Sequence, residues 1–333
     1  MPLKASLPDV NNWGYDSHWI YGLLTPFSFF YSLGVRARTL AYKAGVFKAK
    51  RLPCFTISVG NLTLGGTGKT PFVIGLSNFL TELGLRVAVL SRGYKRKSSK
   101  PLIVSVGNGP EVEVEEAGDE PYLIALKTRA MVAVGKDRAR AFELLAPHKP
   151  HVAILDDGFQ HLRIARDLDF CLVDATRCFG NKRLFPAGPL REPTGSLKRA
   201  DAVVLTRAKR VACLTETKGV LQRLPVFFYT TKAEISGGTP RKATVVCAVS
   251  NPRHVVETAR AMGVEVTGCL SFKDHHWFKE EDIEGIDGCI ITTEKDLVRF
   301  PKGVLEKRDI RVIRLKEELP GELRSFVKER LWL

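Results

Sequence analysis

The sequence predicts an α/β fold: a doubly wound parallel sheet followed by a second, smaller α/β domain. Apolar, β-branched segments alternate with helical segments from Cys54 onward, an order typical of parallel sheets covered by helices. A glycine-rich loop follows the first of these segments, and an aromatic stretch precedes them all. We therefore expect an N-terminal helical segment over residues 1–50, a core domain over 51–226 and a smaller C-terminal α/β domain with linker strands over 227–333.

The composition describes a folded and strongly basic chain. Of its 333 residues, 44% are hydrophobic and 26% are charged, which is typical of a globular protein and unlike a disordered one. Lysine and arginine number 51 against 36 aspartates and glutamates, a formal net charge of +15. This excess favours polyanionic partners such as nucleic acid, an anionic membrane surface or a phosphorylated substrate, without choosing among them.

The N-terminal segment combines aromatic and basic residues. Its aromatic residues are Trp13, Tyr15, Trp19, Tyr21, Phe27, Phe29, Phe30 and Tyr31, and its basic residues are Arg36, Arg38, Lys43, Lys48, Lys50 and Arg51. The apolar run is shorter than the about 20 residues that a membrane span needs, and Pro26 interrupts it. An amphipathic helical segment at a membrane interface fits this pattern, and packing of the aromatic residues on the protein's own core fits it equally well.

The core domain begins with a buried strand over Cys54–Val59, and the next helix begins at Pro71 and ends near Leu83. A hairpin is predicted over Leu102–Val114, because Gly107-Asn108-Gly109 is a typical turn sequence. Further strands are predicted at Arg86–Leu90, Met131–Val134, Val152–Leu155, Phe170–Val173 and Ala202–Leu205, with a helix at Lys136–Leu145.

The smaller domain repeats the alternation of strand and helix after an extended linker over Phe227–Ile235. Its predicted strands are Thr244–Val249, Val264–Leu270, Cys289–Thr292 and Ile310–Leu315, and its helix is His254–Met262.

The glycine-rich loop lies between a strand and a helix, as a phosphate-binding P-loop requires, so a P-loop NTPase-type fold is expected. Glycines let backbone N–H groups approach phosphate oxygens, and the N-terminus of the helix adds partial positive charge. Lys69 is placed to reach the terminal phosphates, Thr70 is placed to ligate Mg²⁺, and Thr63 stands where the strict pattern has glycine. The expected nucleotide contacts are Thr63, Leu64, Gly65, Gly66, Thr67, Gly68, Lys69 and Thr70.

Two adjacent aspartates, Asp156 and Asp157, follow the strand Val152–Leu155. An acidic residue at this end of a parallel strand is where a P-loop enzyme places a partner for Mg²⁺. We favour Asp156 toward the metal and Asp157 toward the substrate, although the sequence alone does not distinguish them.

The base for a phosphoryl transfer is less evident from the residues themselves. Asp119 opens a helix in Gly118-Asp119-Glu120-Pro121, and an N-cap is the favoured interpretation on that evidence. His275 is either a surface histidine or one side of a metal site, and Glu294-Lys295-Asp296 follows a strand, where a functional role and a helix start are both open.

Together these motifs resemble one family, the tetraacyldisaccharide 4'-kinases of lipid A synthesis. The resemblance runs over nearly the whole chain and rests on an ordered set of segments. These are Pro26-Phe27-Ser28, Val59–Pro71, Ser91-Arg92-Gly93-Tyr94, Gly118-Asp119-Glu120-Pro121, Asp156–His161, Gly180-Asn181, Pro186–Pro193, Asp274-His275 and Thr293-Glu294-Lys295-Asp296. Phe159, where the family often has leucine, and the additional His276 depart from the pattern.

The resemblance implies an enzyme that uses ATP and Mg²⁺ to phosphorylate the 4'-hydroxyl of a tetraacylated glucosamine disaccharide 1-phosphate. It implies that Asp119 is the base, assisted by His275, and that Arg191 and Glu192 lie near the substrate with Asp157. It also implies that the N-terminal segment anchors the protein on the anionic inner membrane, so a peripheral position on the cytoplasmic face is expected.

A P-loop nucleotide switch or a nucleic-acid-stimulated ATPase is the alternative function. A guanine-specific switch would need Asn-Lys-x-Asp, and Thr293-Glu294-Lys295-Asp296 lacks the asparagine. A binder of single-stranded nucleic acid would place aromatic residues among its basic ones, whereas the densest run of aromatic residues here lies near the N-terminus, away from the glycine-rich loop. Neither nucleic acid nor an obligate protein partner is expected.

Overall fold

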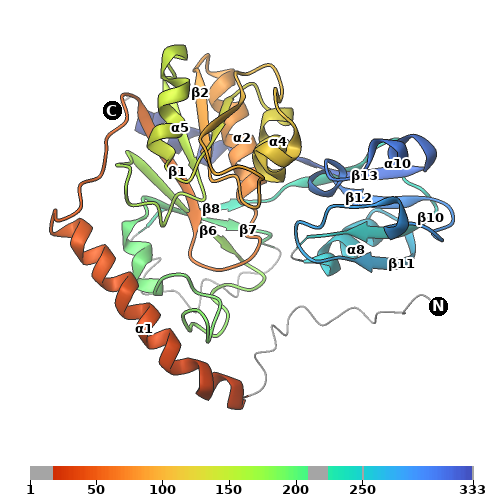
Figure 1. The fold of residues 1–333 in the computed structure, drawn as a ribbon, viewed down its shortest axis with the longest axis horizontal. Helices are drawn as coiled ribbons and strands as arrows, with labels where there is room; N and C mark the ends of the chain where they lie inside the picture. Colours follow the sequence, from red (N-terminus) through yellow and green to blue (C-terminus); the bar gives the residue numbers. More distant parts are fainter. Residues whose placement is uncertain (1–17, 209–223, 250, 332–333) are drawn as a thin grey trace.

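The computed structural model describes residues 18–208, 224–249 and 251–331. Two sheets lie side by side, and a long N-terminal helix runs along the edge of the larger part (Figure 1). The predicted class, an α/β protein with a large parallel sheet and a smaller α/β unit, is confirmed.

The larger sheet has eight strands in the order β3-β4-β2-β5-β1-β6-β7-β8, all parallel except β3. The chain passes from β1 toward β2 on one side of this order and later from β5 to β6 on the other side, so the order reverses beside β1, where a doubly wound sheet is expected to bind its ligand. The strands are β1 Phe55–Asn61, β2 Val87–Ser91, β3 Leu102–Ser105, β4 Met131–Val134, β5 Val152–Asp156, β6 Leu168–Asp174, β7 Ala202–Thr206 and β8 Val226–Tyr229.

Helices cover both faces of this sheet. Its helices are α2 Lys69–Glu82, α3 Val114–Ala117, α4 Asp119–Lys127 and α5 Arg138–Leu145, with 3₁₀ turns at Ala146–His148 and Thr194–Arg199. Phe72 of α2 and Leu123 of α4 pack in one core, and Phe142 of α5 packs in the core on the other face. Asp137 caps α5 by accepting hydrogen bonds from the N–H groups of the helix's first turn.

The hairpin predicted over Leu102–Val114 is wrong. Only its first arm is a strand, β3, and this strand pairs antiparallel with β4. Gly107 and Gly109 turn the chain with positive φ as expected, but the returning arm makes one backbone hydrogen bond to β3, from Glu111 N to Val104 O, before α3 begins at Val114. Pro110 at the start of that arm has no N–H to contribute to a ladder.

The smaller sheet has five strands in the order β11-β10-β12-β13-β9, parallel except for β9. Its elements are β9 Lys232–Ile235, β10 Lys242–Cys247, α8 Pro252–Ala261, β11 Glu265–Ser271, the 3₁₀ turn Glu280–Asp282, β12 Ile290–Thr293, α9 Glu294–Leu297, α10 Lys302–Lys307 and β13 Ile310–Lys316. The predicted linker Phe227–Ile235 is therefore strand at both ends: Phe227 lies in β8 of the larger sheet, and Ile235 ends β9 of the smaller one.

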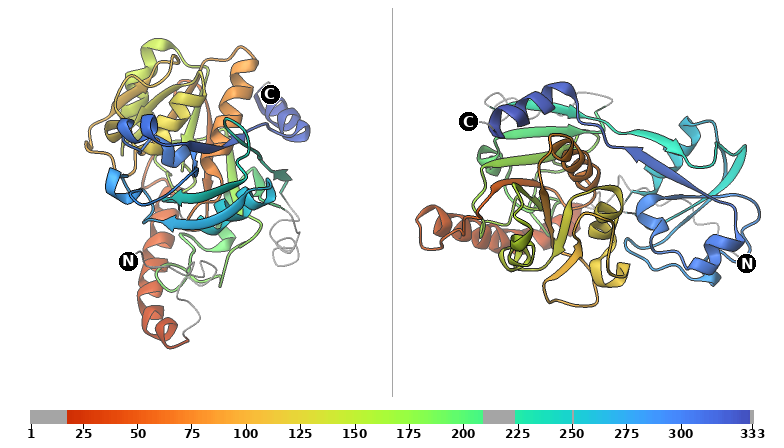
Figure 2. Two further views of the ribbon diagram at one scale, coloured as in Figure 1. Left: turned by 90° about the vertical axis from the view of Figure 1, so that its right-hand side faces the viewer. Right: turned by 90° about the horizontal axis from the view of Figure 1, so that it is seen from above.

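The C-terminal helix, α11 Gly321–Leu331, returns to the larger unit. Leu319, Leu323 and Val327 are buried in the same core as α2 and β1. Figures 1 and 2 show this dark blue helix behind the larger sheet, away from the smaller unit that precedes it. The smaller unit is thus an insertion joined to the larger one by two chain segments.

The N-terminal helix, α1 His18–Lys43, is continuous, and Pro26 lies inside it rather than interrupting it. Ser28 is buried on the face toward the larger unit, where its Oγ donates to Leu184 O at 2.9 Å. The opposite face exposes large apolar side chains, namely Leu23, Phe27, Phe29, Phe30, Leu33 and Leu40. No helix in the described ranges is long and apolar enough to cross a membrane. Trp13 and Tyr15 lie outside those ranges.

Candidate active site

The glycine-rich loop connects β1 to α2 beside the switch point of the sheet. Gly65 and Gly68 adopt positive φ of 89° and 79°, a conformation that glycine reaches without strain, and Gly68 is the N-cap of α2. The Thr206 hydroxyl, at the end of β7, donates to Thr67 O at 3.0 Å. Leu64 N donates to Pro189 O at 2.7 Å, so the irregular first half of the loop is held by the segment that precedes Arg191.

Two arginines support the loop from its other side. Arg177 and Arg207 donate to Gly66 O at 3.0 and 3.1 Å, and both pair with Asp174 at the end of β6. These charges hold the pKa of Asp174 below its ordinary value even though burial alone would raise it. The sequence did not single out these three residues, because their roles arise only when the ends of β6 and β7 meet the loop.

Lys69, the first residue of α2, points into the site. Its Nζ lies 3.4 Å from Asp157 Oδ1 and 3.4 Å from Asn61 Oδ1. Asn61 is the last residue of β1, and its amide also donates to Thr63 O at 2.8 Å. Asn61 was not predicted as a site residue; its position at a strand end was the available signal.

Asp156 is buried at the end of β5 and accepts a 2.7 Å hydrogen bond from the Ser91 hydroxyl at the end of β2. Burial is the first cause that raises the pKa of Asp156 to about 6, and the negative charges of Glu120 and Asp157 add to it. A buried carboxylate gathered with hydroxyl and carboxylate oxygens is the ligand chemistry that Mg²⁺ prefers. The residues present therefore fit the predicted metal.

Asp157 has a φ of 52°, which turns its side chain away from the strand direction. Arg191 Nη1 lies 3.1 and 2.8 Å from its two carboxylate oxygens. Burial would raise the pKa of Asp157, but Lys69 and Arg191 together hold it well below its ordinary value. The two adjacent aspartates are thus distinct: Asp157 is paired with cations, and Asp156 is not.

Asp119 and His275 meet across the two units. Asp119 is buried at the start of α4, where Gly118 is the N-cap, and its Oδ2 accepts from His275 Nδ1 at 2.8 Å. His275 follows β11 of the smaller unit, has a φ of 67° and packs edge-on against Tyr94. Burial alone would raise the pKa of Asp119, whereas the bond to His275 and the charges of Lys295, His275 and Arg299 lower it below the ordinary value.

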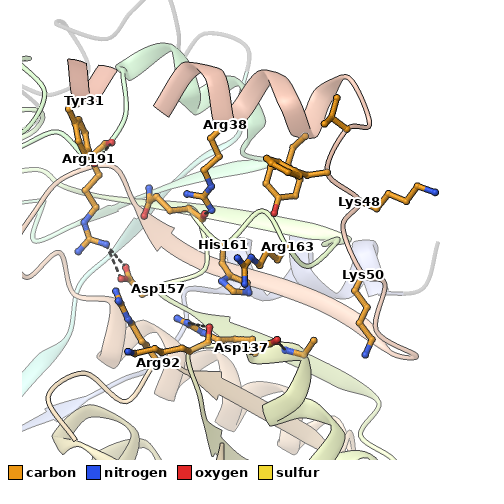
Figure 3. A pocket seen from close by; sticks show the side chains of 17 residues that line it. Tyr31, Arg38, Lys48, Lys50, Arg92, Asp137, Asp157, His161, Arg163 and Arg191 are labelled. Carbon is orange, nitrogen blue, oxygen red and sulfur yellow. Dashed lines mark hydrogen bonds and ion pairs between the residues drawn. The ribbon is translucent and has the colours of Figure 1, made fainter. Parts of the chain in front are cut away.

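A cavity of about 960 Å³ opens at Asp157 and runs along α1. Tyr31 and Arg38 point into it from α1, opposite Arg92 and Asp137 (Figure 3). Its basic lining residues are Arg38, Lys48, Lys50, Arg92, Lys136, Arg138, Arg163 and Arg191. With Asp137 and Asp157 as the acidic lining residues, the cavity carries a strong excess of positive charge.

Arg191 and Glu192, adjacent in sequence, occupy different places. Arg191 lines the cavity, and its carbonyl accepts from Tyr31 Oη at 3.0 Å. Glu192 is buried behind it, and Arg199 holds the Glu192 carboxylate at 2.6 and 3.1 Å. The structure therefore places Glu192 as the partner of Arg199, one layer away from the cavity.

The doubly wound sheet, the loop with Lys69, and an acidic pair at the end of β5 define a P-loop nucleotide-binding protein. The family model described as LpxK, tetraacyldisaccharide-1-P 4'-kinase, matches residues 20–331. The chain belongs to this family.

Named relatives and a solved structure agree with this assignment. A tetraacyldisaccharide 4'-kinase of Desulfotalea psychrophila is 36% identical over 307 residues, covering 84% of this chain and 88% of the relative. That of Geobacter metallireducens is 39% identical over 302 residues, covering 84% and 89%. A crystal structure of LpxK from Aquifex aeolicus, described as an "apo" form in complex with ATP, has a TM-score of 0.76 and 33% identity, covering 94% of this chain and all of the other.

Proposed function

We propose that this protein transfers the γ-phosphate of ATP to the 4'-hydroxyl of a tetraacylated glucosamine disaccharide 1-phosphate, a step of lipid A synthesis. The observation that carries the proposal is the Asp119–His275 pair, because a buried carboxylate hydrogen-bonded to a histidine at 2.8 Å is suited to accept a proton from an alcohol. A nucleotide switch has no need for such a pair.

Each residue of the site has a role in this reaction. Lys69 and the N–H groups of the loop bind the terminal phosphates. Lys69 gives up its contact with Asp157 when the nucleotide binds. Thr70 and Asp156 would hold Mg²⁺, which would neutralise charge on the phosphates. Asp119 accepts the proton of the acceptor hydroxyl, and His275 orients the carboxylate through Nδ1. Arg191 and Asp157 position the sugar at the mouth of the basic cavity.

The basic cavity and α1 suit a lipid substrate. The cavity offers arginines and lysines to an anionic head group, and the exposed apolar face of α1 offers a surface to acyl chains and to the membrane. We therefore propose a peripheral position on the cytoplasmic face of the inner membrane, with the substrate entering along α1.

The direct test uses γ-labelled ATP, Mg²⁺ and the detergent-dispersed lipid disaccharide. Label that moves into the lipid fraction supports the kinase. Label released only as inorganic phosphate, or released faster when nucleic acid is added, contradicts it and favours the alternative ATPase.

The Asp119→Asn variant tests the base. The side chain keeps its shape but cannot take up a proton, so kcat is expected to fall by about 10²–10⁴-fold while the affinity for ATP changes little. Turnover at saturating substrate and nucleotide binding are measured separately. A purely structural role of Asp119 at the start of α4 predicts the reverse: loss of thermal stability with turnover retained.

A further inference from the structure

The carboxylate of Asp119 faces three basic side chains, all contributed by the smaller unit. Besides the His275 bond, Lys295 Nζ and Arg299 Nε each lie 3.8 Å from Asp119 Oδ2. Lys295 is in α9, and Arg299 follows that helix directly. The larger unit contributes the acid and the smaller unit contributes the charge around it.

Arg299 is held rigidly in this position. Its side chain is 1% exposed, and its Nη2 is bonded to Asp296 and to Ala248 O. Its Nε and Nη1 are buried, with no hydrogen-bond partner among the residues that the structure describes. A guanidinium fixed on one side and unpaired on the other directs its remaining charge toward Asp119.

Lys295 joins the two units at the same point. Its Nζ contacts Glu120 Oε1 at 3.0 Å, Asp274 Oδ1 at 3.7 Å and Asp119 Oδ2 at 3.8 Å. A single ammonium group thus bridges the start of α4, which carries Asp119, and the loop of the smaller unit, which carries His275. These carboxylates hold the pKa of Lys295 above its ordinary value despite burial, so the group stays charged.

We propose that Lys295 and Arg299 are positioning residues that keep Asp119 ionised and aimed at the acceptor, so that the base is complete only when the smaller unit is in place. The inference rests on the proposed role of Asp119. Burial without these cations favours the protonated acid, which cannot act as a base. Glu120 and Asp274, which also face this cluster, add negative charge and make the cations more necessary.

The Lys295→Met variant tests the proposal through the pH profile. Asp119 must be deprotonated to act, and loss of a nearby cation raises its pKa. The acid limb of kcat/KM is therefore expected to move to higher pH by about one to three pH units, with little change in KM for ATP. Lys295→Arg keeps the positive charge, so its acid limb of kcat/KM is expected to lie at the same pH as that of the wild type. Lys316→Met, which removes an exposed lysine of β13, is the matched control.

A second measurement does not depend on lipid turnover. The Asp119 carboxyl is titrated by ¹³C NMR in protein labelled at aspartate, with Asp119→Asn assigning the signal. An upward shift of its midpoint in Lys295→Met supports the inference, and an unchanged midpoint overturns it. If the wild-type protein phosphorylates no lipid, the proposed function fails, and this titration still decides the electrostatic role. If transfer occurs and neither the limb nor the midpoint moves, only the inference fails.

Discussion

Asp156 and Asp157 show how two adjacent carboxylates take different states. Burial raises the pKa of Asp156 to about 6 from 3.8, so folding favours its protonated form. The stability that this group contributes is present below pH 3.8 and is lost as the pH rises through about 6. Above that range the ionised Asp156 lowers the free energy of unfolding by about 3 kcal/mol, which corresponds to a shift of about two pKa units. The cation-paired Asp157 has a lowered pKa, so its contribution to stability has the opposite dependence on pH: it is present near neutral pH and is lost as the pH falls.

Asp156→Asn is therefore expected to stabilise the nucleotide-free protein at pH 7.5 by up to about 3 kcal/mol, and to abolish transfer because it removes the proposed metal ligand. Ser91 can still donate to the new amide oxygen. Urea unfolding at pH 7.5 and at pH 4 is the measurement, and the gain should shrink at the lower pH. Asp157→Asn is the matched control and is expected to destabilise, since Lys69 and Arg191 lose their partner. A less stable Asp156→Asn at pH 7.5 would contradict this account of the site.

At the residue level, a role can be predicted from the sequence where the chemistry is local. Lys69 and Thr70 are defined by their spacing from the glycines, and Asp156 by the strand before it. Arg299 could not be found this way, because it gains its role from Asp119, which is distant in sequence; the local signal for Asn61 was its position at the end of a strand. Asp119 shows the limit most clearly: its local context indicated a cap, and only the meeting with His275, 156 positions along the chain, gives it a partner suited to a catalytic base.

At the level of elements, α1 has two faces of different character. Successive helical residues turn by about 100°, which places Leu23, Phe30 and Leu33 on the side opposite Ser28, and Ser28 touches the larger unit. The exposed side chains of Phe27 and Phe30 are 62% and 68% accessible. One face of α1 thus packs on the protein, and the membrane interface stays a prediction for the other, exposed face.

The double variant Phe27→Ser/Phe30→Ser tests the open face. We expect binding to anionic liposomes to weaken by about tenfold or more, because burying a phenylalanine contributes about 1.5–3 kcal/mol, while thermal stability stays close to that of the wild type. Co-sedimentation with vesicles is the measurement. Phe228→Ser, at an exposed position of β8, is the control. Equal binding by both variants would refute a membrane role for this face.

Among the elements, the central strands β1, β5, β6 and β7 were predictable because apolar runs buried on both faces carry a strong local signal. The pairing of β3 was not, since Gly107 and Gly109 indicated a turn but not which strand would receive β3. The linker Phe227–Ile235 contained too little alternation to show that its ends join different sheets.

At the scale of the whole molecule, Lys127 connects the two units. It lies at the C-terminal end of α4, the opposite end from Asp119. Its Nζ contacts Glu294 Oε2 at 2.7 Å, Glu317 Oε1 at 2.6 Å and Leu315 O at 3.0 Å. Burial raises the pKa of Glu317, and Lys127 opposes that effect. This ammonium group fixes how the smaller unit sits against α4.

Lys127→Met would leave two carboxylates facing each other without a cation. We expect the free energy of unfolding to fall by about 2 kcal/mol or more and the ratio of phosphorylated lipid to ATP consumed to fall, because a loosened closure admits water. Chemical denaturation and product stoichiometry are the measurements. Lys242→Met breaks the exposed pair with Glu265 and should cost less than about 1 kcal/mol. Equal losses in the two variants would count against an inter-unit role.

The return of α11 has a consequence for how the chain acquires its structure during synthesis. The ribosome releases the smaller unit before it releases Leu323 and Val327, which complete the core against α2. The core of the larger unit therefore stays incomplete until α11 has been synthesised, while the inserted unit can fold first. A premature stop after β13 would spare every residue of the active site and still leave an apolar face of the nucleotide-binding half uncovered, a defect that protein quality control recognises.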